Sequence, residues 1–129
     1  SFSSDAPVTP IDPWSSIRAA VHHHQPRNAI SARGAFAAAT RGGGRAAGIN
    51  DGLTGTLVPG APASYAVWDI DDLVVAGSHE SVQRWSTDPR SRVPALPDIA
   101  PDARLPRCVR TVHRDEVLFD IGILDGGGT

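Results

Sequence analysis

Apolar residues recur at helical spacing after Asp12, where Trp14, Ile17 and Val21 fall on one face. Asp12 is a favourable N-cap residue, and the proline that follows it is favoured at the first helical position. The pattern therefore predicts a helix over residues 13–24.

A second helical segment follows over residues 31–41, where Ser31 can cap an alanine-rich run with Phe36 as its only large apolar residue. Three consecutive glycines, Gly42–Gly44, are expected to end this helix. Because such a helix has little core of its own to form, it is expected to pack against a partner.

The pattern changes to strands and turns after Gly48. Residues 57–60 predict a short strand and a turn, and residues 65–68 are β-prone. Asp69, Asp71 and Asp72 are expected to be turn residues that close a hairpin onto residues 73–75.

The last part of the chain predicts a second hairpin. Residues 108–113 and 117–123 form its strands, with a turn between them. The preceding stretch, residues 85–106, is rich in Pro and Arg and has neither helical nor strand periodicity, so it is expected to be a covering loop or partly disordered. Residues 124–129 are expected to be a flexible tail.

The first residues of the chain carry the strongest candidate for chemistry. The segment before Asp5 is interpreted as the end of a buried strand, since Pro7 and Pro10 follow it at once. Functional carboxylates in α/β-barrel enzymes typically lie at such strand ends. The alternative is that Asp5 only caps the turn that follows it.

Composition narrows the class of partner. All 12 basic residues among the 129 are arginines, and 14 acidic residues leave a formal charge of −2, so neither nucleic acid nor an anionic membrane is expected as a partner. The absence of lysine, with much Ala, Gly, Arg and Pro, suggests a GC-rich bacterial genome. No signal peptide or long apolar run is recognisable, which predicts a cytoplasmic protein. The single cysteine, Cys108, lies in a β-prone run and is expected to be a buried, inert thiol.

Two other motifs favour structure over chemistry. The run His22–His24 is expected to be solvated at a helix end, because successive imidazoles on a helix diverge by about 100°, although on an extended backbone His22 and His24 would suit a metal. Gly42, Gly44 and Ala47 match a dinucleotide-binding loop only formally, since a helix precedes them where a strand is required.

A third motif is incomplete. His79-Glu80 begins like a zinc-protease motif, but Gln83 occupies the position of the second histidine.

Three motifs in order, SSDAPVTPIDPW, NAISARGAFAAATRGGGRAAG and GTLVPGAPASYAVWD, resemble the C-terminal third of metal-dependent amidohydrolases. The similarity extends over roughly residues 3–76 and points to the branch that includes N-substituted formamide deformylase-like enzymes. It implies an α+β fragment: the last βα unit of a TIM-type (β/α)8 barrel over residues 1–48, then strands of a small β-sandwich over residues 49–123. A complete barrel needs about 250 residues.

The resemblance also implies a function. The family hydrolyses a C–N bond of an amide or formamide with a water molecule activated by a divalent metal, for which zinc is expected. The residue that matches Asp5 binds the metal and acts as the proton shuttle.

The family's other ligands, an H-x-H pair and further His and Lys residues, lie upstream of the matching region, and His22 and His24 do not replace that pair. The isolated chain is therefore expected to bind no metal and to be inactive. The expected partners are a small amide substrate in the intact enzyme and an N-terminal barrel half or a second copy of the chain. The alternative is a non-enzymatic β-rich interaction module.

Overall fold

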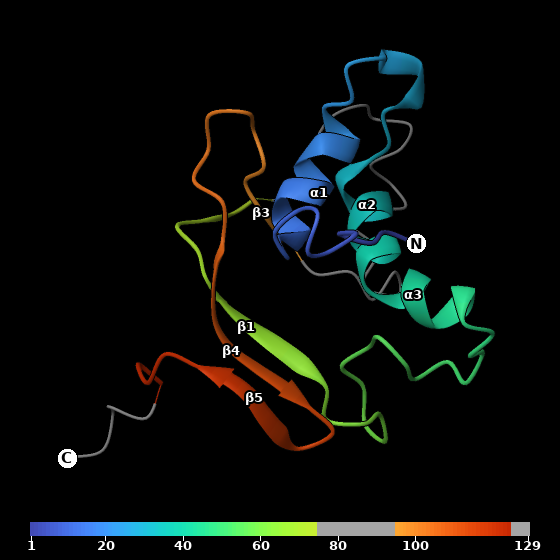
Figure 1. The fold of residues 1–129 in the computed structure, drawn as a ribbon, viewed down its shortest axis with the longest axis vertical. Coiled ribbons are helices and arrows are strands. Elements are labelled where there is room, and N and C mark those ends of the chain that lie inside the picture. The colour runs from blue at the N-terminus through green and yellow to red at the C-terminus, as the bar shows by residue number, and fades with distance from the viewer. Residues whose placement is uncertain (75–94, 125–129) are drawn as a thin grey trace.

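Helices come first and antiparallel strands follow in the computed structural model, which describes residues 1–74 and 95–124 (Figure 1). The α+β class is therefore confirmed, and the arrangement is compatible with a fragment of a larger barrel enzyme. The elements are α1 (Pro13–Val21), η1 (Pro26–Asn28), α2 (Ala32–Ala39), α3 (Arg41–Ala46), β1 (Tyr65–Asp69), β2 (Leu73–Val74), β3 (Leu96–Pro97), β4 (Arg107–His113) and β5 (Glu116–Asp120).

The starts of the first two α-helices are as predicted. Asp12 caps α1 by accepting hydrogen bonds from the Ser15 backbone N–H at 3.0 Å and from the Ser15 hydroxyl at 2.5 Å. Ser31 caps α2 by accepting from the Gly34 N–H at 3.1 Å. Each cap satisfies a backbone donor that the helix itself leaves without a partner. The predicted end of α1 is wrong by three residues, because His22 already lies outside the helix as its C-cap.

Contrary to the prediction, the glycine run does not end a helix: Gly42–Gly44 are three of the six residues of α3. Glycine is tolerated here because neighbouring segments approach too closely for a side chain: a Cβ on Gly42 would lie 3.2 Å from the Ser1 Cα, and one on Gly44 would lie 2.9 Å from the Thr54 Cγ2. The helix ends instead at Ala46, and Gly48, the residue after its C-cap, has a φ of 78°. There the N–H groups of Gly48 and Ile49 donate to the carbonyls of Arg45 and Gly44, the two bonds of a Schellman motif.

The three-stranded sheet has the order β1-β4-β5 and is antiparallel throughout. The predicted hairpin of β4 and β5 is confirmed. Its turn residues Arg114 and Asp115 have φ values of 48° and 68°, as in the type I′ turns that match the twist of a hairpin.

The predicted hairpin between residues 65–68 and 73–75 is wrong for the residues that the structure describes. β1 pairs with β4, whereas β2 pairs with β3. Residues 57–58 form no strand either, although the expected turn is present, with the Ala61 N–H donating to the Val58 carbonyl at 3.0 Å and Gly60 at a φ of 86°.

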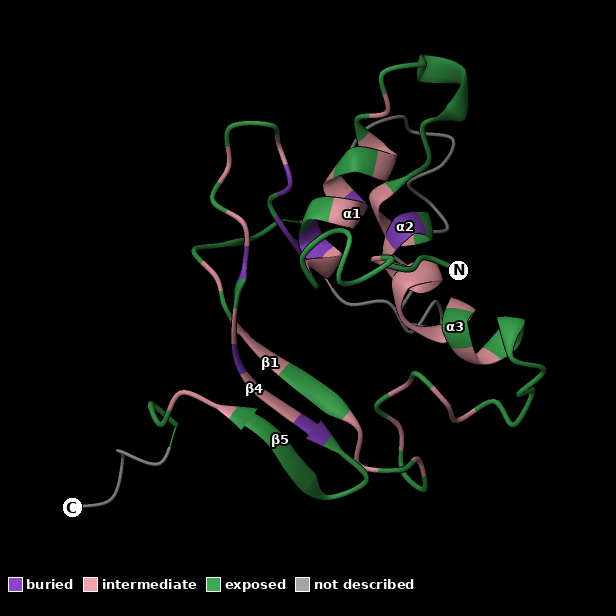
Figure 2. Ribbon diagram, viewed as in Figure 1, coloured by how far each residue is buried: buried purple, intermediate pink, exposed green. Residues whose placement is uncertain are grey.

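The main core lies where α1 and α2 meet the segment that contains β3, as Figure 2 shows by the buried colouring of these elements. Trp14 contacts two rings, stacking on Phe36 at a centroid distance of 5.9 Å and meeting Trp68 edge-on at 6.0 Å. The buried residues of this core are Trp14, Ile17, Ala35, Leu96 and Ile99.

The apolar faces of both helices are therefore largely buried. Trp14 is 5% exposed and Ile17 is 2% exposed, because Leu96 and Ile99 cover them. The described part of the predicted 85–106 loop is thus a cover for the helices. Its residues 85–94, like residue 75 and the motif at His79-Glu80, lie outside the described residues. So does all of the predicted 124–129 tail except residue 124.

Candidate functional site

Asp5 lies in an irregular loop and not at the end of a strand. Residues 1–12 contain no strand, so this prediction is wrong for the described backbone. A strand needs a neighbour to pair with, and the bond that holds this segment is instead one from the Phe2 N–H to the Ala38 carbonyl of α2, at 3.3 Å.

The loop turns at Asp5 itself. Asp5 has a φ of 54°, in the left-handed region that aspartate tolerates better than most residues, and its carbonyl accepts from the Val8 N–H at 3.0 Å. The Thr9 hydroxyl donates to the Ser4 carbonyl and closes the same turn. Asp5 is therefore held by its backbone, and its side chain is left to project from the turn.

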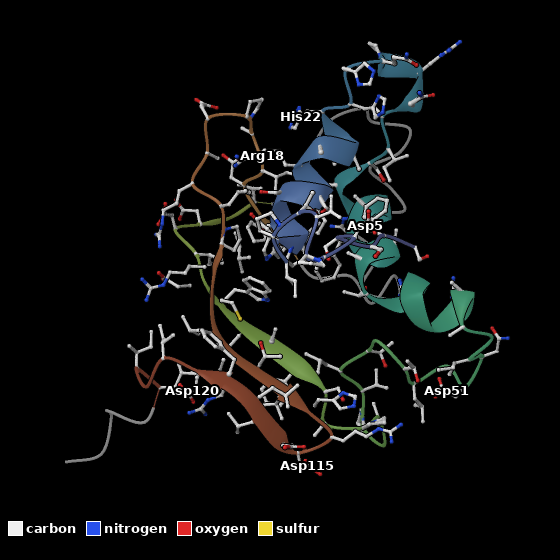
Figure 3. The ribbon with its side chains drawn as sticks, in the orientation of Figure 1. Asp5, Arg18, His22, Asp51, Asp115 and Asp120 are labelled. Carbon is white, nitrogen blue, oxygen red and sulfur yellow. The ribbon has the colours of Figure 1, made fainter. Side chains whose placement is uncertain are left out.

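The Asp5 carboxylate is exposed, and within residues 1–74 and 95–124 it accepts no hydrogen bond (Figure 3). The role of a side-chain cap for the following turn, the alternative to chemistry, is thus not observed. Both carboxylate oxygens are available to a group that approaches from outside.

The loop that carries Asp5 also exposes apolar side chains. Val8 is 78% exposed, Ile11 is 82% exposed and Phe2 is 36% exposed. Large apolar residues gathered on one short segment are typical of a surface that another part of a protein covers.

The three consecutive histidines do not converge. The Nε2 atom of His22 lies 3.1 Å from the Ile99 carbonyl oxygen, and the rings of His23 and His24 stack at 4.4 Å. One turn earlier on α1, the Arg18 guanidinium donates to the Ala103 carbonyl. Arg18 and His22 together fasten the segment after β3 onto α1.

The ion-pair partner of Asp69 and Asp71 was not predicted from the sequence. Arg104 donates to Asp69 at 2.7 Å and also to Asp71. These hydrogen bonds, first the one to Asp69, raise the pKa of Arg104. All three side chains are about half exposed, so the pairs contribute little to stability. No local signal connects residues so far apart in the sequence.

Cys108 is half-buried in β4, and its Sγ lies 3.3 Å from the Thr111 Oγ1. The Cys108 Sγ also lies 3.7 Å from the Arg110 carbonyl oxygen. Cys108 is thus less buried than predicted, and the inertness of its thiol stays a prediction.

A model of the amidohydrolase family matches residues 1–119, from the first residue through the Asp5 loop, the helices and β4 into β5. The chain belongs to the amidohydrolase family. No curated protein and no solved structure matches it. The predicted resemblance is thus confirmed for the amidohydrolases as a family, while the formamide deformylase-like branch stays a prediction.

Amidohydrolases are generally metal-dependent, so we asked whether this chain's residues fit a metal. Three or more protein ligands usually hold a catalytic ion. Among the described residues no three His, Cys, Asp or Glu side chains lie close enough together to hold one. The described part of the chain therefore does not fit a metal ion by itself, and Asp5 is at most one ligand of a larger set.

No helix among the described residues has the length and the apolar character that crossing a bilayer requires.

Proposed function

We propose that this amidohydrolase chain is the C-terminal portion of an enzyme that hydrolyses the C–N bond of an amide or formamide. Asp5 is the catalytic group that it supplies. The observation that carries the proposal is that the family match includes a loop presenting Asp5 with an exposed carboxylate that no described residue engages. The β1-β4-β5 sheet would be part of the companion sandwich, and the helices of the first 48 residues would pack against the barrel.

The chemistry that Asp5 can perform follows from its two free oxygens. A carboxylate accepts a proton from the water that attacks the amide carbon, and then gives that proton to the nitrogen as the C–N bond breaks. The products are a carboxylic acid and an amine, and Asp5 returns to its ionised form. Zinc is the metal that we expect in the intact enzyme, with its other ligands outside the described residues.

The partner that we propose for the isolated chain is a barrel half carrying those ligands. The apolar residues Phe2, Val8 and Ile11 around Asp5 support this proposal, since a covering barrel would remove them from water. We also propose that the protein is cytoplasmic.

The test has two stages. The purified chain is first assayed for formamide and amide hydrolysis with zinc, manganese or cobalt, and we expect no turnover. It is then combined, by fusion or mixing, with an amidohydrolase barrel half that contains an H-x-H pair. In that assembly Asp5→Asn should lower the rate about 10²- to 10⁴-fold, the contribution typical of general acid–base groups.

Matched variants control for folding and for a wrong site. Asp102→Asn removes the charge of another exposed aspartate, and His22→Ala and His24→Ala remove the competing imidazoles; all three should change the rate little. An assembly that tolerates Asp5→Asn but is inactivated by either histidine variant would reject the assignment of Asp5. Turnover by the isolated chain that is lost in Asp5→Asn would instead reject the need for a barrel half.

A β-rich interaction module is the second candidate. It is favoured by β5, where Val117, Leu118 and Phe119 are 54%, 60% and 47% exposed. Gel filtration combined with a metal assay separates the two functions: a monodisperse chain that neither binds metal in the assembly nor restores hydrolysis is a module.

A further inference from the structure

A cavity of about 170 Å³ lies between α3 and the loop that follows it. Figure 1 shows the chain turning back after α3 before it reaches β1. Two arginines of α3, Arg41 and Arg45, line the cavity on the helix side. Residues four positions apart lie on the same face of a helix, so both arginines border the same space.

Neither arginine is neutralised within the part of the chain that the structure describes. No ion pair or hydrogen bond of the described residues involves either guanidinium group, whereas Arg104 and Arg110 are paired with aspartates. Two like charges four residues apart destabilise a helix, and α3 also contains three glycines, which are poor helix formers. A ligand with negative charge would offset the repulsion.

The opposite wall is fixed by close contacts. Gly55 has a φ of 75°, and a Cβ there would lie 2.9 Å from the Arg41 Cα. The Thr54 methyl group fits against Gly44 in the same way. The helix and the loop that border the cavity are therefore in direct contact near both arginines.

The carboxylate in the cavity lining is already engaged. Asp51 accepts from the Leu53 N–H at 2.9 Å, the Thr54 N–H at 2.8 Å and the Thr54 hydroxyl at 2.7 Å. These bonds, first those from Thr54, lower the pKa of Asp51, so it remains ionised. With two cations and one anion, the lining keeps a net positive charge.

We propose that Arg41 and Arg45 form a binding site for a small oxyanion, a phosphate or a carboxylate group. The planar guanidinium group presents paired N–H donors that match the oxygens of either group. The site does not depend on C–N hydrolysis and lies on a different segment from Asp5.

The test is a titration of the full chain at low ionic strength, in which binding is measured by calorimetry and by changes in amide chemical shifts. Inorganic phosphate and acetate are used as separate probes. We expect saturable one-to-one binding of at least one probe, with shifts centred on residues 41–55. Binding of phosphate alone, of acetate alone or of both identifies the group that the site takes.

Variants decide whether the two arginines are responsible. Arg41→Gln and Arg45→Gln should each weaken binding about tenfold, as expected for loss of a charged hydrogen bond. Arg45→Lys keeps the positive charge but lacks the paired N–H donors, so it should weaken binding less than Arg45→Gln. Arg27→Gln, which removes an exposed arginine of η1, should have no effect. The proposal is overturned if neither probe binds saturably, or if binding is equal in Arg45→Gln and Arg27→Gln.

Discussion

Gly44 of α3 lies against Thr54 so closely that a Cβ on Gly44 would be 2.9 Å from the Thr54 Cγ2, whereas a Cβ on the adjacent Gly43 would meet nothing within 4 Å. Two neighbouring glycines in one helix thus have opposite surroundings. This difference makes the role of each one measurable.

Gly43→Ala should raise the free energy of unfolding by about 1 kcal/mol, because alanine is the better helix former. Gly44→Ala should not, since the same gain is offset by the clash with Thr54. Chemical denaturation of both variants is the measurement. Adding Thr54→Ser, which removes the methyl group and keeps the hydroxyl that donates to Asp51, should restore the gain. Equal stabilisation by both single alanine variants would contradict the contact.

The turn between β4 and β5 can be improved. Arg114 and Asp115 both have positive φ, a conformation that costs most residues about 1 kcal/mol and that Asn-Gly adopts readily. The double variant Arg114→Asn/Asp115→Gly should therefore raise the melting temperature. Asp102→Gly is the matched control in a turn without positive φ, and it should lower stability. If both changes destabilise the chain, the turn is not type I′ in solution.

The interactions of the Asp120 carboxylate should make the stability of the chain depend on pH. The Gly122 N–H, at 2.6 Å, and then the Arg110 guanidinium lower the pKa of Asp120 in the folded chain. Its contribution to stability is therefore present above the unfolded pKa of about 3.9 and is lost as the pH falls through the lower folded value. Urea midpoints measured below about pH 4 should fall less steeply in Asp120→Asn than in the wild type. Asp102→Asn, which removes a charge from a surface turn, is the control, and an equal change in both variants would contradict the assignment.

The cover over α1 can be tested at Ile99. Ile99 is 7% exposed and belongs to the core with Ile17. Ile99→Ala and Ile17→Ala should each cost about 2 to 5 kcal/mol of unfolding free energy, and Ile99→Ala should speed amide exchange in α1. Val8→Ala, at a position 78% exposed, should cost little. Unchanged exchange in α1 would show that residues 95–99 do not hold the helix.

Local signals in the sequence were sufficient for some elements. Asp12 and Ser31 cap the helices that they were expected to cap, because capping involves only the next three residues. The β4-β5 hairpin was predictable for the same reason, since its strands are joined by a short turn.

Contacts between distant segments were not predictable. β1 pairs with β4 and not with β2, the next strand in the sequence. β3 lies in a stretch that has no hydrophobic periodicity. That Gly42 and Gly44 lie inside a helix was missed because the residues packed against them, Ser1 and Thr54, belong to other segments of the chain. Asp5 stays a predicted site residue; the strand predicted before it is absent because that segment has no strand to pair with among the described segments.

The fastening of α1 by Arg18 and His22 has a consequence for synthesis on the ribosome. The contacted carbonyls of Ala103 and Ile99 lie 85 and 77 positions further along the chain. At about 5 to 20 residues per second, their arrival takes roughly 4 to 17 seconds. During that interval the nascent chain has Trp14 and Ile17 without the cover that Leu96 and Ile99 supply in the folded chain.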